Sequence, residues 1–506
     1  MYRSTKIHIG SLSLGGDAPV RLQSMTNTDT LDVEASVAQV IRIIEAGGDM
    51  VRLTTQGIKE AEALALIKKE VWKAGFDTPL IADVHFSPRV AEFAAGIVAK
   101  VRINPGNYVD KRATFRKVEF TDKEYEEELE RIHARMLPLI KKCLADDTAI
   151  RIGVNHGSLS DRIMTRYGNT PEGMAVSAME FIRIMAAENF HRLVLSMKSS
   201  NSLIMIEATK LLVKMMQDEG YAYPLHLGVT EAGEGEDGRI RSALGIGALL
   251  RQGIGDTIRV SLSEPPENEI PVARKIVEYS SPRKGSAKGS PLEGNANGSP
   301  LEGGLGGVKG SPFEGGKSRA AGQGDVKKEA KAKAEAKNTL FLRYNLKDPE
   351  ALTIKAAVDS SVELVERQAT DLEIDNGINL PAEKIQSIKD GILQAARIKF
   401  TRNEYISCPT CGRTKFDLPA VVEKVKKATS HLKGLKIAIM GCIVNGPGEM
   451  ADADYGYIGG ADGKVHIYRG KEPVFKNVPE DEAVNKLVQI IEQDLQDPPL
   501  RGARGV

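Results

Sequence analysis

Residues 149–158 read AIRIGVNHGS, an apolar run that ends in polar residues. A strand of a parallel sheet has this composition, because helices cover both faces of such a sheet. Seven more segments share the pattern, and amphipathic, helix-like stretches separate them. They are VRLQSM from residue 20, DMVRLTT from 49, PLIADVHF from 79, KVRINPGN from 100, RLVLSMKSSN from 192, PLHLGVTEAG from 224 and DTIRVSLSE from 256. Eight β/α units in roughly 260 residues predict a (β/α)8 TIM barrel over residues 1–279.

Basic and polar residues stand at the ends of these strands. In a TIM barrel the carboxyl ends of the strands meet at one mouth, where the active site lies. Several guanidinium groups in one concave site recognise phosphate oxygens, because the cations repel one another unless an anion joins them. For any single arginine a surface ion pair is an equally good explanation, but it does not account for the whole set. We predict an anion site formed by Arg52, Arg102, Asn104, Arg151, Asn155, Lys198, Arg259 and Ser261.

Acid and base groups are predicted at the same mouth. Asp83 and His85 in ADVHF project to one side of a strand because they are two residues apart, and His156 and Glu231 follow two other strands. A lone histidine is more often a hydrogen-bonded structural residue than a catalyst. The acidic, glycine-rich stretch TEAGEGEDGR at 230–239 is interpreted as a mobile loop over the site.

The composition excludes two classes of partner. The 506 residues include 69 Lys and Arg against 68 Asp and Glu, which leaves no broad basic surface for nucleic acid. The start of the sequence lacks the apolar core of a signal peptide, and no segment approaches the roughly 18 apolar residues of a membrane span. We therefore expect a cytoplasmic protein without a nucleic-acid or membrane partner.

The composition changes after the predicted barrel. Residues 280–338 are rich in Gly, Ser, Pro and Lys and contain GSPLEG twice and GSPFEG once. Such a segment buries too little apolar surface to offset its chain entropy, so we predict a low-complexity, disordered linker. Residues 339–400 regain a globular pattern and predict a small mixed module within this middle insert. Residues 401–506 predict an α/β unit whose strand LKIAIM ends at GCIVNGPGE.

Three of the four cysteines lie close together in the C-terminal unit. Cys408 and Cys411 stand in SCPTCGRT, and Cys442 and Glu449 stand in MGCIVNGPGE. A CxxC pair also occurs in redox dithiols and in zinc sites, but a structural zinc ion normally takes four Cys or His ligands. Three thiolates and one open position favour a catalytic [4Fe-4S] cluster, with Glu449 as the candidate for a replaceable fourth ligand. Zinc and a dithiol remain the alternatives.

Long motifs span the barrel and the C-terminal unit. They are VRINPGN, RIGVNHGSLSDRIM, SMKSSN, LHLGVTEAGEGEDGR, DTIRVSLSEPPE, SCPTCGRT and AIMGCIVNGPGEMADADYGY. Together they resemble one enzyme family, the 4-hydroxy-3-methylbut-2-enyl diphosphate synthases of the methylerythritol phosphate route to isoprenoids. The resemblance implies a two-electron reductive ring opening and dehydration of 2-C-methyl-D-erythritol 2,4-cyclodiphosphate. It also implies that the C-terminal α/β unit is a ferredoxin-like domain whose [4Fe-4S] cluster closes over the barrel.

The resemblance also assigns roles to individual residues. It implies that Cys408, Cys411, Cys442 and Glu449 hold the cluster, and that Glu449 moves aside during turnover. It implies that the eight residues of the predicted anion site bind the diphosphate, and that a ferredoxin or a flavodoxin donates the electrons. Near the reacting carbons it implies active-site roles for His85, Glu231 and Asn445.

The region between barrel and cluster unit differs from that of two-domain family members. Residues 280–400 resemble a shortened form of the middle domain found in the larger, three-domain type. A homodimer is compatible with the sequence, because the cluster unit of one subunit could close over the barrel of another. Two other functions are kept open: a different iron-sulfur barrel enzyme acting on a phosphorylated small molecule, and a zinc-stabilised protein that binds a phosphorylated ligand without turnover.

Overall fold

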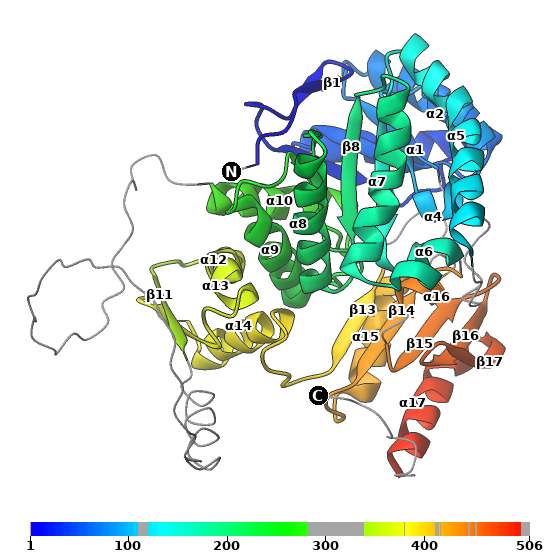
Figure 1. Ribbon diagram of the computed structural model, residues 1–506. Coiled ribbons are helices and arrows are strands. Elements are labelled where there is room, and N and C mark those ends of the chain that lie inside the picture. The colour runs from blue at the N-terminus through cyan, green and yellow to red at the C-terminus, as the bar shows by residue number, and fades with distance from the viewer. Residues whose placement is uncertain are drawn as a thin grey trace, which may run out of the picture. The chain divides into compact units, whose positions relative to one another are not determined.

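The structure is a computed structural model that describes residues 2–84, 86–109, 120–281, 338–378, 380–409, 414, 416–443, 446–450 and 453–496. Along the chain these residues form a barrel, a small middle module and a C-terminal α/β unit (Figure 1). The linker predicted over 280–338 lies outside the described residues except at 280, 281 and 338.

Eight parallel strands form the barrel, and each falls within one of the eight segments predicted from the sequence. They pair in the order β8-β7-β6-β5-β4-β3-β10-β9, and a parallel bridge between Leu195 and Leu225 connects β8 to the residues just before β9. The two ends of the sheet therefore meet, as a barrel requires. The strands are β3 (Arg21–Met25), β4 (Met50–Thr54), β5 (Leu80–Asp83), β6 (Lys100–Ile103), β7 (Ala149–Asn155), β8 (Leu193–Lys198), β9 (His226–Leu227) and β10 (Thr257–Ile258).

Helices follow every strand of the barrel. Polar side chains start several of them: Asp32 accepts a hydrogen bond from the Ala35 amide, and Thr121 and Glu124 form a capping box. The longer helices are α1 (Val33–Glu45), α2 (Ile58–Lys73), α3 (Pro88–Ala95), α5 (Asp122–Ala145), α7 (Pro171–Ala187), α8 (Ser202–Asp218), α9 (Gly235–Leu250) and α10 (Glu269–Ser280). Shorter ones are α4 (Pro105–Tyr108), η1 (His156–Ser158), α6 (Asp161–Tyr167) and η2 (Pro266–Asn268).

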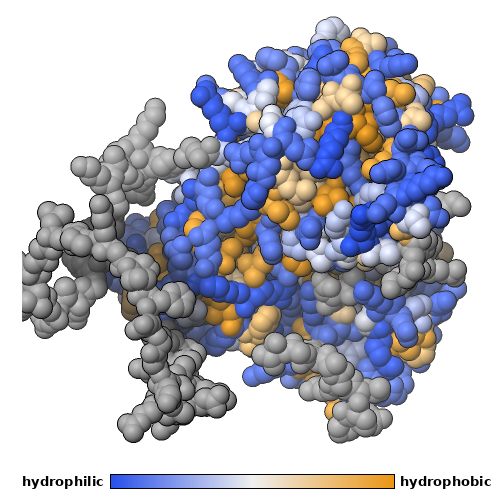
Figure 2. All heavy atoms as spheres, in the orientation of Figure 1, coloured by the Kyte–Doolittle hydropathy of each residue, from blue (hydrophilic) through white to orange (hydrophobic). Residues whose placement is uncertain are grey.

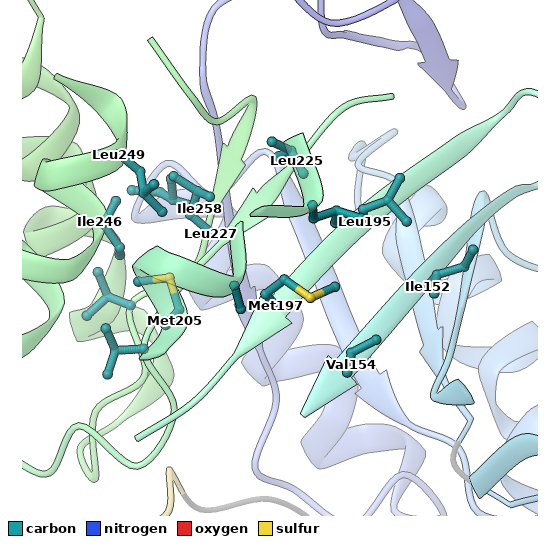
Figure 3. Close-up of a cluster of buried hydrophobic side chains, with 14 of the residues drawn as sticks. Ile152, Val154, Leu195, Met197, Met205, Leu225, Leu227, Ile246, Leu249 and Ile258 are labelled. Carbon is teal, nitrogen blue, oxygen red and sulfur yellow. The ribbon is translucent and has the colours of Figure 1, made fainter. Parts of the chain in front are cut away.

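The outward face of the strands packs against these helices through apolar side chains. Leu195 and Met197 project to the same side of β8 because they are two residues apart. Figure 3 shows them in a cluster that includes Met205 of α8 and Ile246 of α9, all of which are buried. Because this layer takes the outward positions, the alternate positions of each strand point into the barrel.

A short hairpin covers the amino-terminal end of the barrel. Its strands β1 (Ile7–Ile9) and β2 (Leu12–Leu14) pair antiparallel, and it was not among the predicted elements. The Ile7, Ile9 and Leu14 side chains form an apolar cluster with the first inward residues of four barrel strands. Those residues are Met50, Ile81, Ala149 and Val194.

The middle module packs on the barrel helices. Its two strands are parallel, and the apolar side chains of its first helix, such as Leu352 and Ile354, belong to the same buried cluster as the barrel core. The elements are β11 (Thr339–Tyr344), α12 (Pro349–Asp359), α13 (Ser361–Val365), β12 (Asp371–Asn376) and α14 (Ala382–Ala395).

The C-terminal unit is α/β, as predicted, with a five-stranded mixed sheet. Its strands lie side by side in chain order, from β13 to β17, and only the first three are parallel. This order differs from the interleaved split βαβ arrangement that the term ferredoxin-like denotes, so the prediction holds for the α/β class. The elements are β13 (Glu404–Ser407), α15 (Leu418–Thr429), β14 (Lys436–Met440), α16 (Gly446–Glu449), β15 (Tyr455–Gly459), β16 (Lys464–Arg469), β17 (Glu472–Pro479) and α17 (Glu480–Gln496).

The surface mixes hydrophilic and hydrophobic residues. On the face seen in Figure 2, hydrophobic residues form separate groups among hydrophilic ones. Among the helices that the structure describes, none has the length and apolar character needed to cross a bilayer.

Candidate active site at the barrel mouth

The carboxyl ends of the barrel strands surround one cavity of about 100 Å³. Seven of the eight residues predicted to bind an anion line this cavity, and so do Glu231 and two of the cysteines. The barrel contributes Met25, Arg52, Asp83, Arg102, Arg151, Asn155, Lys198, His226, Thr230, Glu231, Arg259 and Ser261. The C-terminal unit contributes Cys408, Pro409, Met440, Cys442 and Gly446.

Asn104 is the member of the predicted anion set that does not line the cavity. Its side-chain oxygen accepts a hydrogen bond from the Gly106 amide at 3.2 Å, which makes Asn104 the N-cap of α4. An asparagine at the end of a strand and just before a proline is also a helix-start signal, and Asn104 starts a helix in this structure.

Asp83 and the main chain of β7 hold Arg102 in place. The Arg102 guanidinium lies 3.1 Å from Asp83 Oδ1, and it donates to Gly153 O and Asn155 Oδ1, both also at 3.1 Å. Arg52 shares the same carboxylate at 3.9 Å. Gly153 makes room for this arrangement, because a Cβ at that position would lie 2.5 Å from Arg102 Nε.

A second buried carboxylate holds Arg259. Glu269, the first residue of α10, accepts from Arg259 Nε at 3.2 Å and from Arg259 Nη2 at 3.1 Å. The same carboxylate accepts from Ser24 Oγ at 2.6 Å and from the Leu262 amide at 3.2 Å. Glu269 is only 1% exposed and was not predicted from the sequence. Its four bonds fix the guanidinium at the cavity wall, a form of preorganisation.

Arg151 and Lys198 are buried cations that lack such support. Arg151 Nε and Nη1 have no hydrogen-bond partner among the described residues. Glycine at 228 leaves space for the Lys198 amine, since a Cβ there would lie 2.2 Å from Nζ. Burial, followed by the neighbouring Arg52 and Arg102, holds the pKa of Arg151 well below its usual range. Burial and then Arg151 lower the pKa of Lys198. Neither group forms an ion pair with a described residue, and an anionic ligand in the cavity would supply the missing partner.

Among the predicted acid and base groups, Glu231 and Asp83 line the cavity. Glu231 follows β9 with a backbone φ of 50°, a left-handed conformation that is uncommon outside glycine and that recurs at functional sites. His156 does not line the cavity, and its Nε2 lies 3.0 Å from Asn169 O. His85 and Asn445 lie outside the described residues.

The two described cysteines of the predicted cluster follow neighbouring parallel strands of the C-terminal sheet. Cys408 follows β13 and Cys442 comes two residues after β14, and both line the cavity. The Gly441 amide donates to Cys408 Sγ at 3.2 Å. Cys411 lies outside the described residues, as does the side chain of Glu449 in α16. Among the described residues, no group of three or more Cys, His, Asp and Glu forms a metal site.

Specific contacts hold the C-terminal unit at the barrel mouth. Ser263 Oγ lies 2.8 Å from Ser407 Oγ and donates to Cys408 O at 3.1 Å, and Arg241 donates to Tyr405 O at 2.8 Å. These contacts connect the loop after β10 and helix α9 to strand β13.

The stretch 230–239 was interpreted as a mobile loop. In the structure its second half is the first turn of α9, and its acidic side chains form ion pairs. Glu234 lies 2.9 Å from Lys426 Nζ of the C-terminal unit, and Asp237 pairs with Arg402. Glu234 and Asp237 therefore contribute to docking of the C-terminal unit, whereas Glu236 pairs with Lys384 of the middle module.

The fold and the cavity define a class of protein: a TIM-barrel enzyme for a small anionic substrate, with thiols of a second unit facing the same cavity. Residues 4–274 match the family model described as the GcpE TIM-barrel domain, and residues 404–493 match the GcpE protein C-terminal domain. The chain belongs to the GcpE family.

Curated relatives match almost the whole chain. The 4-hydroxy-3-methylbut-2-en-1-yl diphosphate synthase (flavodoxin) of Phocaeicola vulgatus is 46% identical over 596 aligned positions, which cover 96% of this chain and 97% of the relative. The synthases of the same name from Porphyromonas gingivalis and Akkermansia muciniphila are 40% and 39% identical, each with 97% of both chains covered. Among solved structures, a sialic acid synthetase from Leptospira borgpetersenii matches 58% of this chain and 94% of its own at 11% identity, with a TM-score of 0.35.

Proposed function

We infer that this chain is an oxidoreductase that converts 2-C-methyl-D-erythritol 2,4-cyclodiphosphate into 4-hydroxy-3-methylbut-2-enyl diphosphate, a step of isoprenoid precursor biosynthesis. The observation that supports this function most directly is the cavity itself, in which strand-end cations of the barrel and two cysteines of the C-terminal unit meet. A diphosphate matches the cations, and a reduction requires a redox group near the same substrate.

The charges of this reaction suit the cavity. Ring opening breaks the bond between C2 and a phosphate oxygen, and the C3 hydroxyl leaves as water. Two electrons and one proton enter, and the product carries one more negative charge, because the oxygen released from C2 becomes a terminal phosphate oxygen. Fixed cations around that oxygen stabilise the charge as it develops.

The positions of the cavity residues support a role for each of them in this proposal. Arg102 and Arg259, which Asp83 and Glu269 hold rigidly, orient the diphosphate, and Arg151 and Lys198 supply the uncompensated positive charge. Glu231, His85 and Asn445 act near the reacting carbons in this proposal. Of these three, Glu231 lies at the cavity wall and is suited to hold the proton that the reaction consumes.

A [4Fe-4S] cluster held by Cys408, Cys411, Cys442 and Glu449 is part of the proposal. The donor chemistry fits: two sulfur atoms line the substrate cavity, and a main-chain amide donates to one of them, as is common around iron-sulfur clusters. When bound, such a cluster supplies electrons one at a time. The name of the relatives supports flavodoxin as the donor of these electrons.

Anaerobic turnover tests the proposed function. Protein with quantified iron and sulfide is incubated with the cyclodiphosphate and a one-electron chemical reductant, and the hydroxylated butenyl diphosphate is measured by mass. We expect product from the wild type, and loss of iron and product in Cys442→Ser. Cys143→Ser is the matched control, because Cys143 is a fully buried thiol in the barrel core. Absence of product from iron-replete wild-type protein would contradict the proposed substrate.

A further inference from the structure

A second layer of inward-facing polar residues lies beneath the cavity. Lys100 stands two residues before Arg102 on β6, so both project into the barrel. His226 of β9 lies at the cavity wall. Lys100 and His226 are each at most 1% exposed. Lys100 is in register with Ile81 of β5 and Ala149 of β7, so this layer borders the apolar cluster that the amino-terminal hairpin covers.

Lys100 and His226 are basic groups without an anionic partner. Lys100 Nζ contacts the Met50 sulfur at 3.5 Å, a weak acceptor, and no carboxylate among the described residues lies within ion-pair distance of it. His226 Nδ1 lies 3.4 Å from Thr257 Oγ1, and no residue that the structure describes forms a hydrogen bond with its Nε2. Both side chains can therefore accept a proton or a hydrogen bond that the described residues do not provide.

The groups around this layer are mostly cationic. Burial, then Arg151 and Arg52, hold the pKa of Lys100 well below its usual range. Burial, then Lys198 and Arg151, lower the pKa of His226. Burial and the neighbouring cations therefore both shift Lys100 and His226 toward the neutral form. The charged groups that face the cavity are Arg52 from β4, Asp83 from β5, Arg102 from β6, Arg151 from β7, Lys198 from β8, Arg259 after β10 and Glu231 after β9.

We propose that Lys100 and His226 form a proton-accepting floor of the substrate cavity, and that each takes up a proton from the solvent when the diphosphate binds above it. This inference rests on the proposed function. The cyclodiphosphate brings two negative charges that offset the surrounding cations. Its binding therefore raises the pKa of both floor residues. The floor then supplies positive charge as the ring opens and the terminal phosphate gains its extra negative charge.

The proposal predicts proton uptake linked to binding. Each phosphorus of the cyclodiphosphate carries one strongly acidic group, so the ligand keeps two negative charges across neutral pH and binds no proton itself. Binding takes up protons when the pH lies between the pKa of the empty form and that of the loaded form, so affinity falls as the pH rises through this window. Histidine titrates at lower pH than lysine, so His226 acts on the acidic side of the window and Lys100 on the alkaline side.

Calorimetry of binding to the oxidised, cluster-containing enzyme measures this uptake without turnover. Titrations of the cyclodiphosphate in buffers of different ionisation enthalpy give the number of protons bound at each pH. We expect wild-type uptake of about one proton per ligand within the window. Lys100→Met should remove uptake on the alkaline side, and His226→Asn should remove it on the acidic side. His191→Asn is the matched control. His191 lies just before β8, at the end of the barrel opposite the cavity, and its Nδ1 lies 2.8 Å from the Tyr223 hydroxyl.

Three results would overturn the proposal. They are no uptake by the wild type between about pH 6 and 9, wild-type uptake in both folded floor variants, and equal loss in the control. If a floor variant fails to fold by circular dichroism, Lys100→Gln or His226→Gln replaces it. If the cyclodiphosphate gives no binding heat, the proposed substrate is wrong, and sulfate replaces it as a dianion that does not titrate in this range. Uptake with sulfate would then support the floor independently of the substrate.

Discussion

The two ends of the barrel are built from the same strands and use them in opposite ways. On β4 the inward residues change from Met50 to Arg52, and on β7 they change from Ala149 to Arg151. The first of each pair packs against the amino-terminal hairpin, and the second lines the cavity. A step of two residues, close to 7 Å along a strand, separates apolar packing from buried charge.

This contrast separates stability from function within one element. The apolar end gains free energy from burial, whereas the cationic end holds like charges in a low-dielectric site without full compensation. Residues at the mouth should therefore cost stability in the empty protein and be required for turnover. Residues at the hairpin end should do the reverse.

The strongest test of this contrast is Arg151→Met. We expect kcat/KM to fall by about 100- to 1000-fold, the range seen when one preorganised charge-stabilising donor is removed. The thermal midpoint of the ligand-free protein should rise, because a buried cation with two unpartnered nitrogens is replaced by an apolar side chain. Steady-state kinetics and thermal unfolding of the same preparation measure both effects.

A basic residue at the other end of the barrel is the control for Arg151→Met. Arg192, just before β8, forms an ion pair with the exposed Asp147. Arg192→Met should leave kcat/KM within about twofold and change the free energy of unfolding by less than about 1 kcal/mol. A fall in the thermal midpoint of Arg151→Met would show that the buried cation stabilises the empty protein, against the contrast drawn above.

Glu269→Gln tests whether Arg259 at the barrel mouth depends on the carboxylate that accepts its hydrogen bonds. The substitution leaves Arg259 buried without a negative charge, so we expect about 3 kcal/mol less stability to chemical denaturation. The kcat should fall about tenfold because the guanidinium loses its fixed orientation, with KM changed less than kcat. Glu267→Gln is the neighbouring control, since the partly exposed Glu267 pairs with Arg42 at 2.9 Å rather than with a cation of the cavity. Equal effects of the two substitutions would remove Glu269 from a positioning role.

Much of this architecture could be predicted from the sequence, because the barrel pattern is local. Each strand carries its own apolar run and its own polar end, and neighbouring strands repeat the pattern. Parallel pairing then brings those ends together, which is why Arg52, Arg102, Arg151, Lys198 and Arg259 all reach the cavity.

The remaining site residues depend on contacts that no local pattern reveals. Glu269 resembles any acidic residue in a first helical turn until its contact with Arg259 is seen. His226 could have been predicted from the sequence. It stands two residues before Gly228, so the two residues project to the same, inward side of the strand. Asn104 was assigned to the anion site because its position at a strand end fits both a ligand and a helix cap.

The apolar end supplies the last test, because a change there should affect folding and leave chemistry alone. Ile9, in the first strand of the hairpin, is fully buried against the first inward residues of the barrel strands. Ile9→Ala removes three buried carbon atoms and should lower the free energy of unfolding by about 2 to 4 kcal/mol. Denaturant titration measures this loss, and kcat/KM at a temperature where the variant stays folded should match the wild type. His8→Ala, at the exposed position beside it, should change neither quantity appreciably. If Ile9→Ala lowered kcat/KM in fully folded protein, the hairpin would be coupled to the cavity through the floor formed by Lys100 and His226, and the two ends of the barrel could no longer be treated as independent.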